Sequence, residues 1–248
     1  MKTFKYIDFL AEFGIGGAHP GGFHLSKEVL SELPIDQSSR VLEVGCGTGQ
    51  TTAYIKKKYK CNMYALDNHP VMISKAKKRF AENNLQVHVQ EADIRSMPFP
   101  NSFFDIVIAE SVTCFTDIST SLQEYSRVLK DNGVLLAIEM TTDKLLLQHE
   151  VKEITSMYDI SEILTKKQWI TKLTQTGFET VNVLKTSTVN HSLFRQEQPE
   201  FNFSANIDPE LFKLWANHND MTQKYRHILG YGVFIAKKEA IKEEKVQG

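Results

Sequence analysis

The sequence has few of the features that mark secreted, membrane or fibrous proteins. Only three of its 248 residues are cysteines, an odd set without paired spacing, which indicates reduced thiols rather than disulfides or a zinc site. No apolar run approaches the ~20 residues of a membrane span. Charges interrupt residues 1–13, where a signal peptide would need an apolar centre. We therefore expect a cytoplasmic protein without a membrane partner.

The chain also lacks an excess of charge of either sign. It has 29 Lys and Arg against 30 Asp and Glu, so its net charge of -1 provides no overall field to attract nucleic acid or anionic lipid. Glycine (13) and proline (7) are too few for a fibrous or disordered chain, and 42% of the residues are hydrophobic. This composition favours a globular protein with a small-molecule partner and leaves the oligomeric state open.

Short apolar runs alternate with amphipathic segments between residues 40 and 140. Strands are expected at 40–44, 62–66, 87–90, 104–109 and 134–138, and helices at 51–60, 69–80 and 118–129. Parallel strands need helical crossovers, so this alternation predicts a doubly wound α/β sheet with helices on both faces. Further on, the sequence predicts helices at 142–158 and 165–176, strands at 178–184 and 232–237, and a helix from 208 to about 228.

No linker or internal repeat divides the chain, so we expect a single domain over residues 1–248. Residues 1–37 form an N-terminal helical cap and a glycine-rich loop (Gly14, Gly16, Gly17, Gly21, Gly22), residues 38–140 the core, and 141–238 the C-terminal half. An insertion of about residues 187–229 separates the last two strands. The charged tail, 239–248, is expected to be solvated.

The segment Val41–Gly49 (VLEVGCGTG) leads from the first strand into a turn with glycines at 45, 47 and 49. In an open α/β sheet this position is the expected nucleotide site. A dinucleotide fingerprint would require glycine at position 50, where this chain has Gln50. Glu43 would oppose a pyrophosphate and suit a cationic ligand, although it can equally brace the turn by hydrogen bonding backbone amides.

Two aspartates follow the next strands. Asp67 ends the second strand, where a carboxylate can accept hydrogen bonds from both ribose hydroxyls. Asp93 follows the third strand and can accept from an adenine amino group while Ile94 packs on the ring. These residues together predict an adenosine site.

In this order, the motifs resemble the class I S-adenosylmethionine-dependent methyltransferases, in particular their small-molecule branch. The resemblance covers about residues 38–140 and includes Ala65–Asp67, Glu91–Asp93, Met97–Pro100, Phe104–Ile108 and Tyr125–Gly133. It implies a seven-stranded Rossmann-like sheet with an antiparallel last strand, and S-adenosyl-L-methionine as cofactor with S-adenosyl-L-homocysteine as product. The cofactor residues that it implies are Glu43, Gly45, Cys46, Gly47, Gly49, Asp67, Asn68, Ala92, Asp93, Ile94, Glu110 and Ser111.

Methyl transfer by in-line displacement needs mainly positioning, and a general base only where the acceptor must lose a proton. His19 and His24, in the N-terminal loop, are the candidate bases, although loop histidines are commonly exposed or capping residues. The candidate acceptor residues are Tyr6, Cys114, His191 and His218, each of which also fits a core or surface role. No metal-ligand spacing is present, so we expect no metal.

Three other functions remain open at this stage. A nicotinamide-dependent oxidoreductase would use the same sheet, and a non-catalytic protein would bind the cofactor without turnover. A polynucleotide or protein acceptor is the third alternative, because basic residues gather at 56–60 and 75–79. The absence of interleaved aromatic residues favours two solvated helix faces there.

Overall fold

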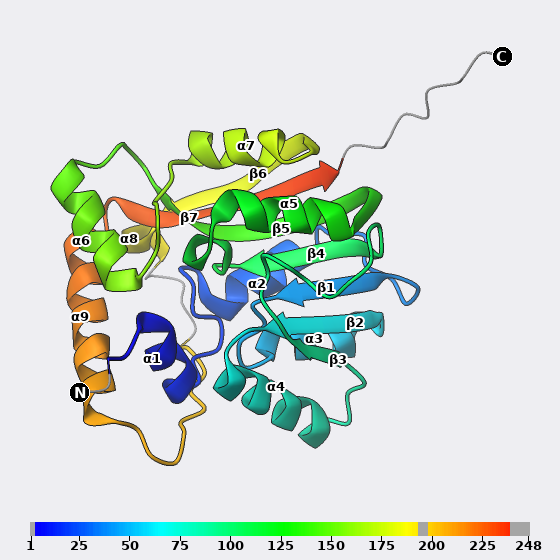
Figure 1. The fold of residues 1–248 in the computed structure, drawn as a ribbon, viewed down its shortest axis with the longest axis horizontal. Helices are drawn as coiled ribbons and strands as arrows, with labels where there is room; N and C mark the ends of the chain where they lie inside the picture. Colours follow the sequence, from blue (N-terminus) through cyan, green and yellow to red (C-terminus); the bar gives the residue numbers. More distant parts are fainter. Residues whose placement is uncertain (1–2, 193–197, 239–248) are drawn as a thin grey trace.

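The computed structural model describes residues 3–192 and 198–238, built around a seven-stranded sheet (Figure 1). The spatial order is β3-β2-β1-β4-β5-β7-β6, and β7 runs antiparallel to both β5 and β6. The strands are β1 (Arg40–Val44), β2 (Asn62–Asp67), β3 (His88–Glu91), β4 (Phe104–Glu110), β5 (Leu129–Thr142), β6 (Phe178–Thr188) and β7 (Leu229–Lys238). The predicted doubly wound sheet with an antiparallel last strand is confirmed.

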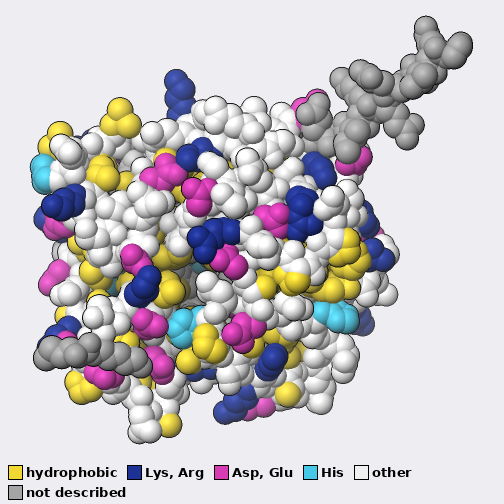
Figure 2. Space-filling model, in the orientation of Figure 1, with side chains coloured by type: hydrophobic (Ala, Val, Ile, Leu, Met, Phe, Trp, Pro, Cys, Tyr) yellow, Lys and Arg dark blue, Asp and Glu magenta, His cyan; other side chains and the backbone are white. Residues whose placement is uncertain are grey.

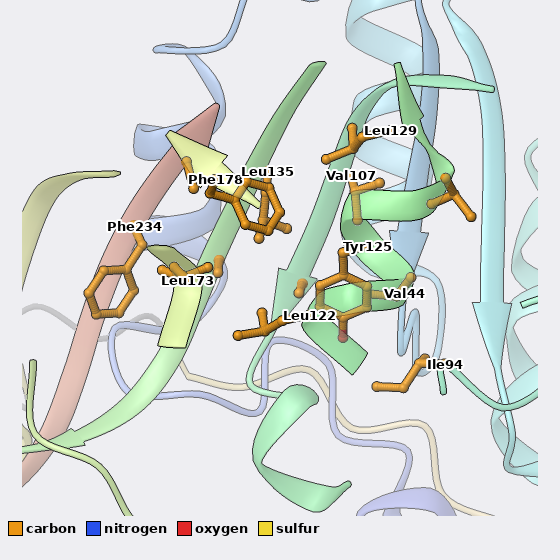
Figure 3. Close-up of a cluster of buried hydrophobic side chains, with 14 of the residues drawn as sticks. Val44, Ile94, Val107, Leu122, Tyr125, Leu129, Leu135, Leu173, Phe178 and Phe234 are labelled. Carbon is orange, nitrogen blue, oxygen red and sulfur yellow. The ribbon is translucent and has the colours of Figure 1, made fainter. Parts of the chain in front are cut away.

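Helices cover both faces of the sheet. They are α1 (Tyr6–Phe13), α2 (Gly22–Leu30), α3 (Gln50–Tyr59), α4 (Pro70–Glu82), α5 (Ile118–Val128), α6 (Gln148–Tyr158), α7 (Lys166–Gln175), α8 (Val189–Ser192) and α9 (Pro209–Tyr225), with a 3-10 turn, η1 (Thr113–Phe115). Tyr125 and Leu122 of α5 and Leu173 of α7 pack on one face (Figure 3). Helices α2, α3 and α4 pack on the other, since successive strand residues point to opposite faces.

A third layer lies beyond the carboxyl ends of the parallel strands, at the left of Figure 1. Helices α1, α6 and α9 meet there around buried Phe9, Ile154 and Leu211. Because the crevice at the carboxyl ends of such strands is the usual ligand site, this layer stands where it can cover a ligand.

Element boundaries differ from the prediction where tertiary pairing acts. Strand β5 begins at Leu129, directly after α5, because Leu129 pairs with Phe104, and it extends to Thr142 because β7 pairs along it. The helix expected from residue 142 therefore begins only at Gln148. Helix α2 was not predicted and starts at Gly22, within the glycine-rich segment. The tail at 239–248 lies outside the described residues.

The glycine-rich loop is held by a distant segment, residues 198–204, which we call the strap. Gly16 N donates to Glu200 O at 3.0 Å, and Asn202 N donates to Phe13 O at 3.1 Å. Helix α4 fixes the strap from the other side, because Arg79 Nη2 donates to Glu200 Oε1 at 2.6 Å. The insertion thus closes against the N-terminal loop, about 190 residues away along the chain.

The basic segments of α3 and α4 are partly engaged within the chain. Lys56 donates to Cys61 O at 2.7 Å, Lys75 to Ala11 O at 2.7 Å, and Arg79 Nε to Thr48 O at 2.8 Å. Figure 2 shows basic and acidic side chains interspersed over the face that it presents. These contacts favour solvated, structural helix faces over a polynucleotide surface.

The three cysteine thiols are free and buried. Within residues 3–192 and 198–238, no helix has both the length and the apolar character to cross a membrane.

Candidate functional site

The first cavity, of about 170 Å³, lies where β1, β2 and β4 end. Nine of the twelve predicted cofactor residues line it: Glu43, Gly45, Cys46, Gly47, Asp67, Asn68, Ile94, Glu110 and Ser111. The chain order of the strands reverses between β1 and β4, and loops there diverge to leave a crevice. We call it the cofactor cavity.

The three turn glycines have different surroundings. A Cβ added at Gly47 would meet only Met72 Sδ, at 3.9 Å, so this backbone borders open space. At Gly49 it would lie 2.6 Å from Phe80 Cζ, and Gly49 does not line the cavity. Gly47 thus admits close approach of a ligand, whereas Gly49 allows α3 and α4 to pack closely.

Two further predicted residues lie outside the lining. Ala92 N donates to Asp67 O at 3.0 Å, which holds the end of β3 beside β2. Asp93 forms an ion pair with Arg95 at 2.6 Å, and this partner lowers the pKa of Asp93. The adenine contact expected of Asp93 stays a prediction, and the structure places only its neighbour Ile94 in the cavity wall.

Buried carboxylates dominate the cofactor cavity. Thr52 Oγ1 donates to Glu43, and Thr51 Oγ1 donates to Glu110 Oε2 at 2.9 Å. Burial, followed by the charge of Glu110, raises the pKa of Glu43 well above its ordinary value. Among the described residues, Glu110 Oε1 is buried and has no hydrogen-bond partner. These acids would gain from a cationic ligand that supplies the missing partner.

Asp67 is oriented by the turn on either side of it. Its Oδ2 accepts from Gly47 N at 2.9 Å and its Oδ1 accepts from His69 N at 2.8 Å. Burial nevertheless raises the pKa of Asp67. Because each carboxylate oxygen can accept two hydrogen bonds, the side chain retains capacity for ligand hydroxyls.

A second cavity, of about 370 Å³, lies beneath α1, α6, α9 and the strap. It shares part of its wall with the cofactor cavity, including Gly16, His19, Gln50, Ser111 and Phe115. The two spaces are therefore adjacent. We call the second one the acceptor cavity, after the methyl acceptor that the sequence leads us to expect.

His19 stands at the junction, and only 2% of its side chain is exposed. Its Nδ1 lies 3.2 Å from Pro20 O and its Nε2 lies 3.1 Å from Ser26 Oγ. A carbonyl only accepts, so Nδ1 carries the hydrogen, and Nε2 accepts at its lone pair from the Ser26 hydroxyl. Glu110 Oε2 lies 3.8 Å from Nε2, where its charge would stabilise a protonated His19.

A buried acid lies behind the segment that separates the cavities. Thr113 N and Oγ1 both donate to Glu139 Oε1, the backbone bond at 3.3 Å. Burial raises the pKa of Glu139 to about 8, so the group is mostly protonated at neutral pH. Glu139 thereby braces η1, whose residues Cys114 and Phe115 line the acceptor cavity.

The acidic side chains of the cofactor cavity distinguish a cationic ligand from a dinucleotide. Three acids, Glu43, Asp67 and Glu110, line it, and no Lys or Arg is among the described lining residues. A dinucleotide would bring two phosphate charges against these acids, so the oxidoreductase alternative is disfavoured.

Comparison with known proteins agrees with this electrostatic argument. A family model described as "Methyltransferase domain" matches residues 41–133. The uncharacterized methyltransferase YodH of Bacillus subtilis is 34% identical over 234 residues, which cover 94% of this chain and 99% of that protein. The chain is a class I S-adenosylmethionine-dependent methyltransferase. Its cofactor is S-adenosyl-L-methionine.

Two further similarities concern more distant proteins. (+)-O-methylkolavelool synthase of Herpetosiphon aurantiacus is 24% identical to this methyltransferase, covering 87% of this chain and 79% of the synthase. The solved structure of phosphoethanolamine N-methyltransferase 2 of Haemonchus contortus, with phosphomonomethylethanolamine and S-adenosylhomocysteine, superposes with a TM-score of 0.75 at 18% identity. That match covers 94% of this chain and 57% of the other. The structural likeness supports the shared fold.

The candidate acceptor residues of the methyltransferase divide into two groups. Tyr6, Cys114 and His218 line the acceptor cavity. His191 is exposed on α8, and the candidate base His24 is exposed on α2. Neither residue lines the cofactor cavity or the acceptor cavity. Within the described residues, no group of three or more His, Cys, Asp or Glu is placed to hold a metal ion.

Several residues of the site escaped the sequence reasoning. Ser26 bonds His19, Gln50 lines both cavities, and Tyr158 and Trp215 line the acceptor cavity. Position 50 was noted only as a missing glycine, although it begins the helix after the turn. The other three carry no local signal, because tertiary packing alone brings them to the cavity.

Proposed function

We propose that this methyltransferase methylates a small molecule held in the acceptor cavity, with His19 as the general base. The observation that carries the proposal is the place of His19 in the walls of both cavities, with Nε2, which lies 3.1 Å from Ser26 Oγ, as its basic atom. The cavity volume of about 370 Å³ supports a small acceptor over a polynucleotide or protein segment. The three free thiols support a reducing, cytoplasmic location.

The cofactor residues are proposed from the cavity wall. Asp67 would accept the ribose hydroxyls, Ile94 would pack on adenine, and the backbone at Gly47 would approach the methionine part. Glu110, with its unpartnered Oε1, would face the positively charged end of the ligand. When bound, the cofactor supplies an electrophilic methyl group on a sulfonium.

His19 would act on the proton that the acceptor loses. When the acceptor atom takes the methyl group that the bound cofactor would supply, its proton would move to His19 Nε2, from which the Ser26 hydroxyl would turn away. Ser26 can rotate its hydroxyl to accept from the new N–H, and Glu110 offsets the imidazolium charge. Such a base contributes about 10² to 10⁴-fold to the rate.

A metabolite-extract screen with methyl-labelled cofactor tests this proposal, followed by mass identification of the product and comparison of variants. His19→Ala should lower turnover of the identified acceptor by about 10² to 10⁴-fold and leave S-adenosylhomocysteine affinity within about threefold. His24→Ala is the matched control and should keep full turnover. Equal turnover by both variants would show that His19 is only a structural residue of the loop.

A further inference from the structure

The acceptor cavity has an aromatic wall. Its volume of about 370 Å³ is more than twice the ~150 Å³ that can hold one benzene ring. Seven Phe, Tyr and Trp side chains line it: Tyr6, Phe9, Phe23, Phe115, Tyr158, Phe201 and Trp215. A wall of this kind binds flat rings by stacking and by burial of apolar surface.

The described part of the acceptor cavity offers no free positive charge to an anionic acceptor. None of its described lining residues is Lys, Arg or Asp. Its one carboxylate among them, Glu200, uses both oxygens, with Arg79 Nη2 donating at 2.6 Å and Gln50 Nε2 at 2.8 Å. An anion buried there would lack a counter-charge, which is costly.

The surroundings of His218 in the same cavity disfavour a positive charge. Its ring centre lies 5.4 Å from that of Tyr6 and 5.9 Å from that of Tyr158. Burial lowers the pKa of His218 to about 4, so the ring is neutral at pH 7. A cationic acceptor would also lack a free counter-charge among the described lining residues, because Glu200 is already paired with Arg79 and Gln50.

A polar cluster interrupts this apolar wall, away from the cofactor. The hydroxyls of Tyr6 and Tyr158 each lie 3.3 Å from His218 Nδ1, and none of the three residues lines the cofactor cavity. One ring nitrogen either donates one hydrogen or accepts at one lone pair, and Tyr158 also hydrogen bonds to the side chain of Thr222, so the hydroxyl of Tyr6 can turn from His218 toward a ligand. The cluster therefore retains hydrogen-bonding capacity for a neutral oxygen of a ligand.

We infer that the acceptor is an uncharged, mainly apolar ring compound with two oxygen functions. A hydroxyl group would stand beside His19 and receive the methyl group, and a hydroxyl or carbonyl oxygen would bind the Tyr6–Tyr158–His218 cluster. This inference rests on the proposed function, because His19 identifies the end of the cavity where transfer occurs.

Binding of four matched probes to the protein saturated with S-adenosylhomocysteine tests this class without turnover. The probes are 2,7-dihydroxynaphthalene, 2-naphthol, 2-naphthyl phosphate and 2-(aminomethyl)naphthalene, measured by isothermal titration at pH 7. The dihydroxy compound should bind at least about tenfold more tightly than the phosphate and the ammonium. Equal or tighter binding of either charged probe, or no binding of both neutral probes at about 1 mM, would overturn the inference.

Two variants locate the second oxygen. Tyr6→Phe should reduce the preference for the dihydroxy compound over 2-naphthol by about 3- to 10-fold, since one net hydrogen bond is lost. Tyr64→Phe is the matched control, because Tyr64 lies on β2 in a ring cluster with Phe99 and Phe104 and outside the cavity. An unchanged preference in Tyr6→Phe would overturn the assignment of the second oxygen to the cluster.

Saturation with S-adenosylhomocysteine is measured first, by titration of the protein alone. Absence of that binding would contradict the proposed function. Failure of the neutral probes on the loaded protein would contradict the acceptor class and leave methyl transfer intact.

Discussion

Replacement of the buried acid Glu139 by Gln should change how the stability of the methyltransferase depends on pH. Burial raises the pKa of this carboxyl from 4.5 to about 8 in the folded state. Between these values the folded protein holds a proton that the unfolded chain releases, so the stabilisation is complete below pH 4.5 and is lost as pH rises toward 8. Each pKa unit corresponds to about 1.4 kcal/mol.

From pH 5.5 to pH 7.5, this one group should lower the free energy of unfolding by about 2.5 kcal/mol. This free energy is slightly less than the value for two full pH units, because part of Glu139 in the folded protein is already ionised at pH 7.5. Gln resembles the protonated carboxyl in shape and can still accept from Thr113 N. Glu139→Gln should therefore remove this share of the pH dependence. Between pH 5.5 and pH 7.5, the variant should lose about 2.5 kcal/mol less unfolding free energy than the wild type.

Urea unfolding of both proteins at pH 5.5, 6.5 and 7.5 measures the effect. Glu43 also has a raised pKa, but it is present in both proteins and largely cancels in the comparison. Glu124→Gln is the control, because its ion pair with Arg127 lowers the pKa of Glu124, which therefore ionises below this window. Parallel pH profiles of wild type and Glu139→Gln would refute the reasoning.

Four other substitutions have distinct expected results. Asp67→Ala should weaken S-adenosylhomocysteine binding by about 1.5 to 3 kcal/mol, measured by isothermal titration, and unchanged affinity would dismiss the ribose contact. Gly47→Val should abolish that binding and cost some stability through its positive φ, whereas Gly49→Val should lower the melting temperature further, because its side chain would also collide with Phe80 of α4. Arg79→Met should leave the Glu200 carboxylate without its cation and speed proteolysis of the strap, and an unchanged cleavage rate would show that other contacts suffice.

The cofactor-binding half of the fold could be predicted from the sequence, because short-range patterns of residue type and spacing specify its elements. A buried strand such as Arg40–Val44 followed by glycines, and Asp67 at the next strand end, report their positions through residue type and spacing alone. Helix boundaries set by capping were also accessible, as at Thr165, whose side chain accepts from Gln168 N.

The acceptor half could not be predicted in this way, because the residues that form it come from distant segments of the chain. Tyr6, Tyr158 and His218 meet only after α1, α6 and α9 pack together. Strand β5 extends beyond its predicted bounds because β7 supplies a partner along it, which no local pattern announces. The ion pair of Asp93 with Arg95 is likewise not specified by the position of Asp93 after its strand.

The strap has a consequence for the order in which this enzyme matures. Every residue that lines the cofactor cavity lies between positions 7 and 116, yet the loop that closes it is tied to Glu200 and Asn202. A nascent chain emerges from the ribosome N-terminal end first, so the residues of this cavity leave it well before the two residues that tie the loop down. The loop can therefore take its final position only after residue 202 has been synthesised.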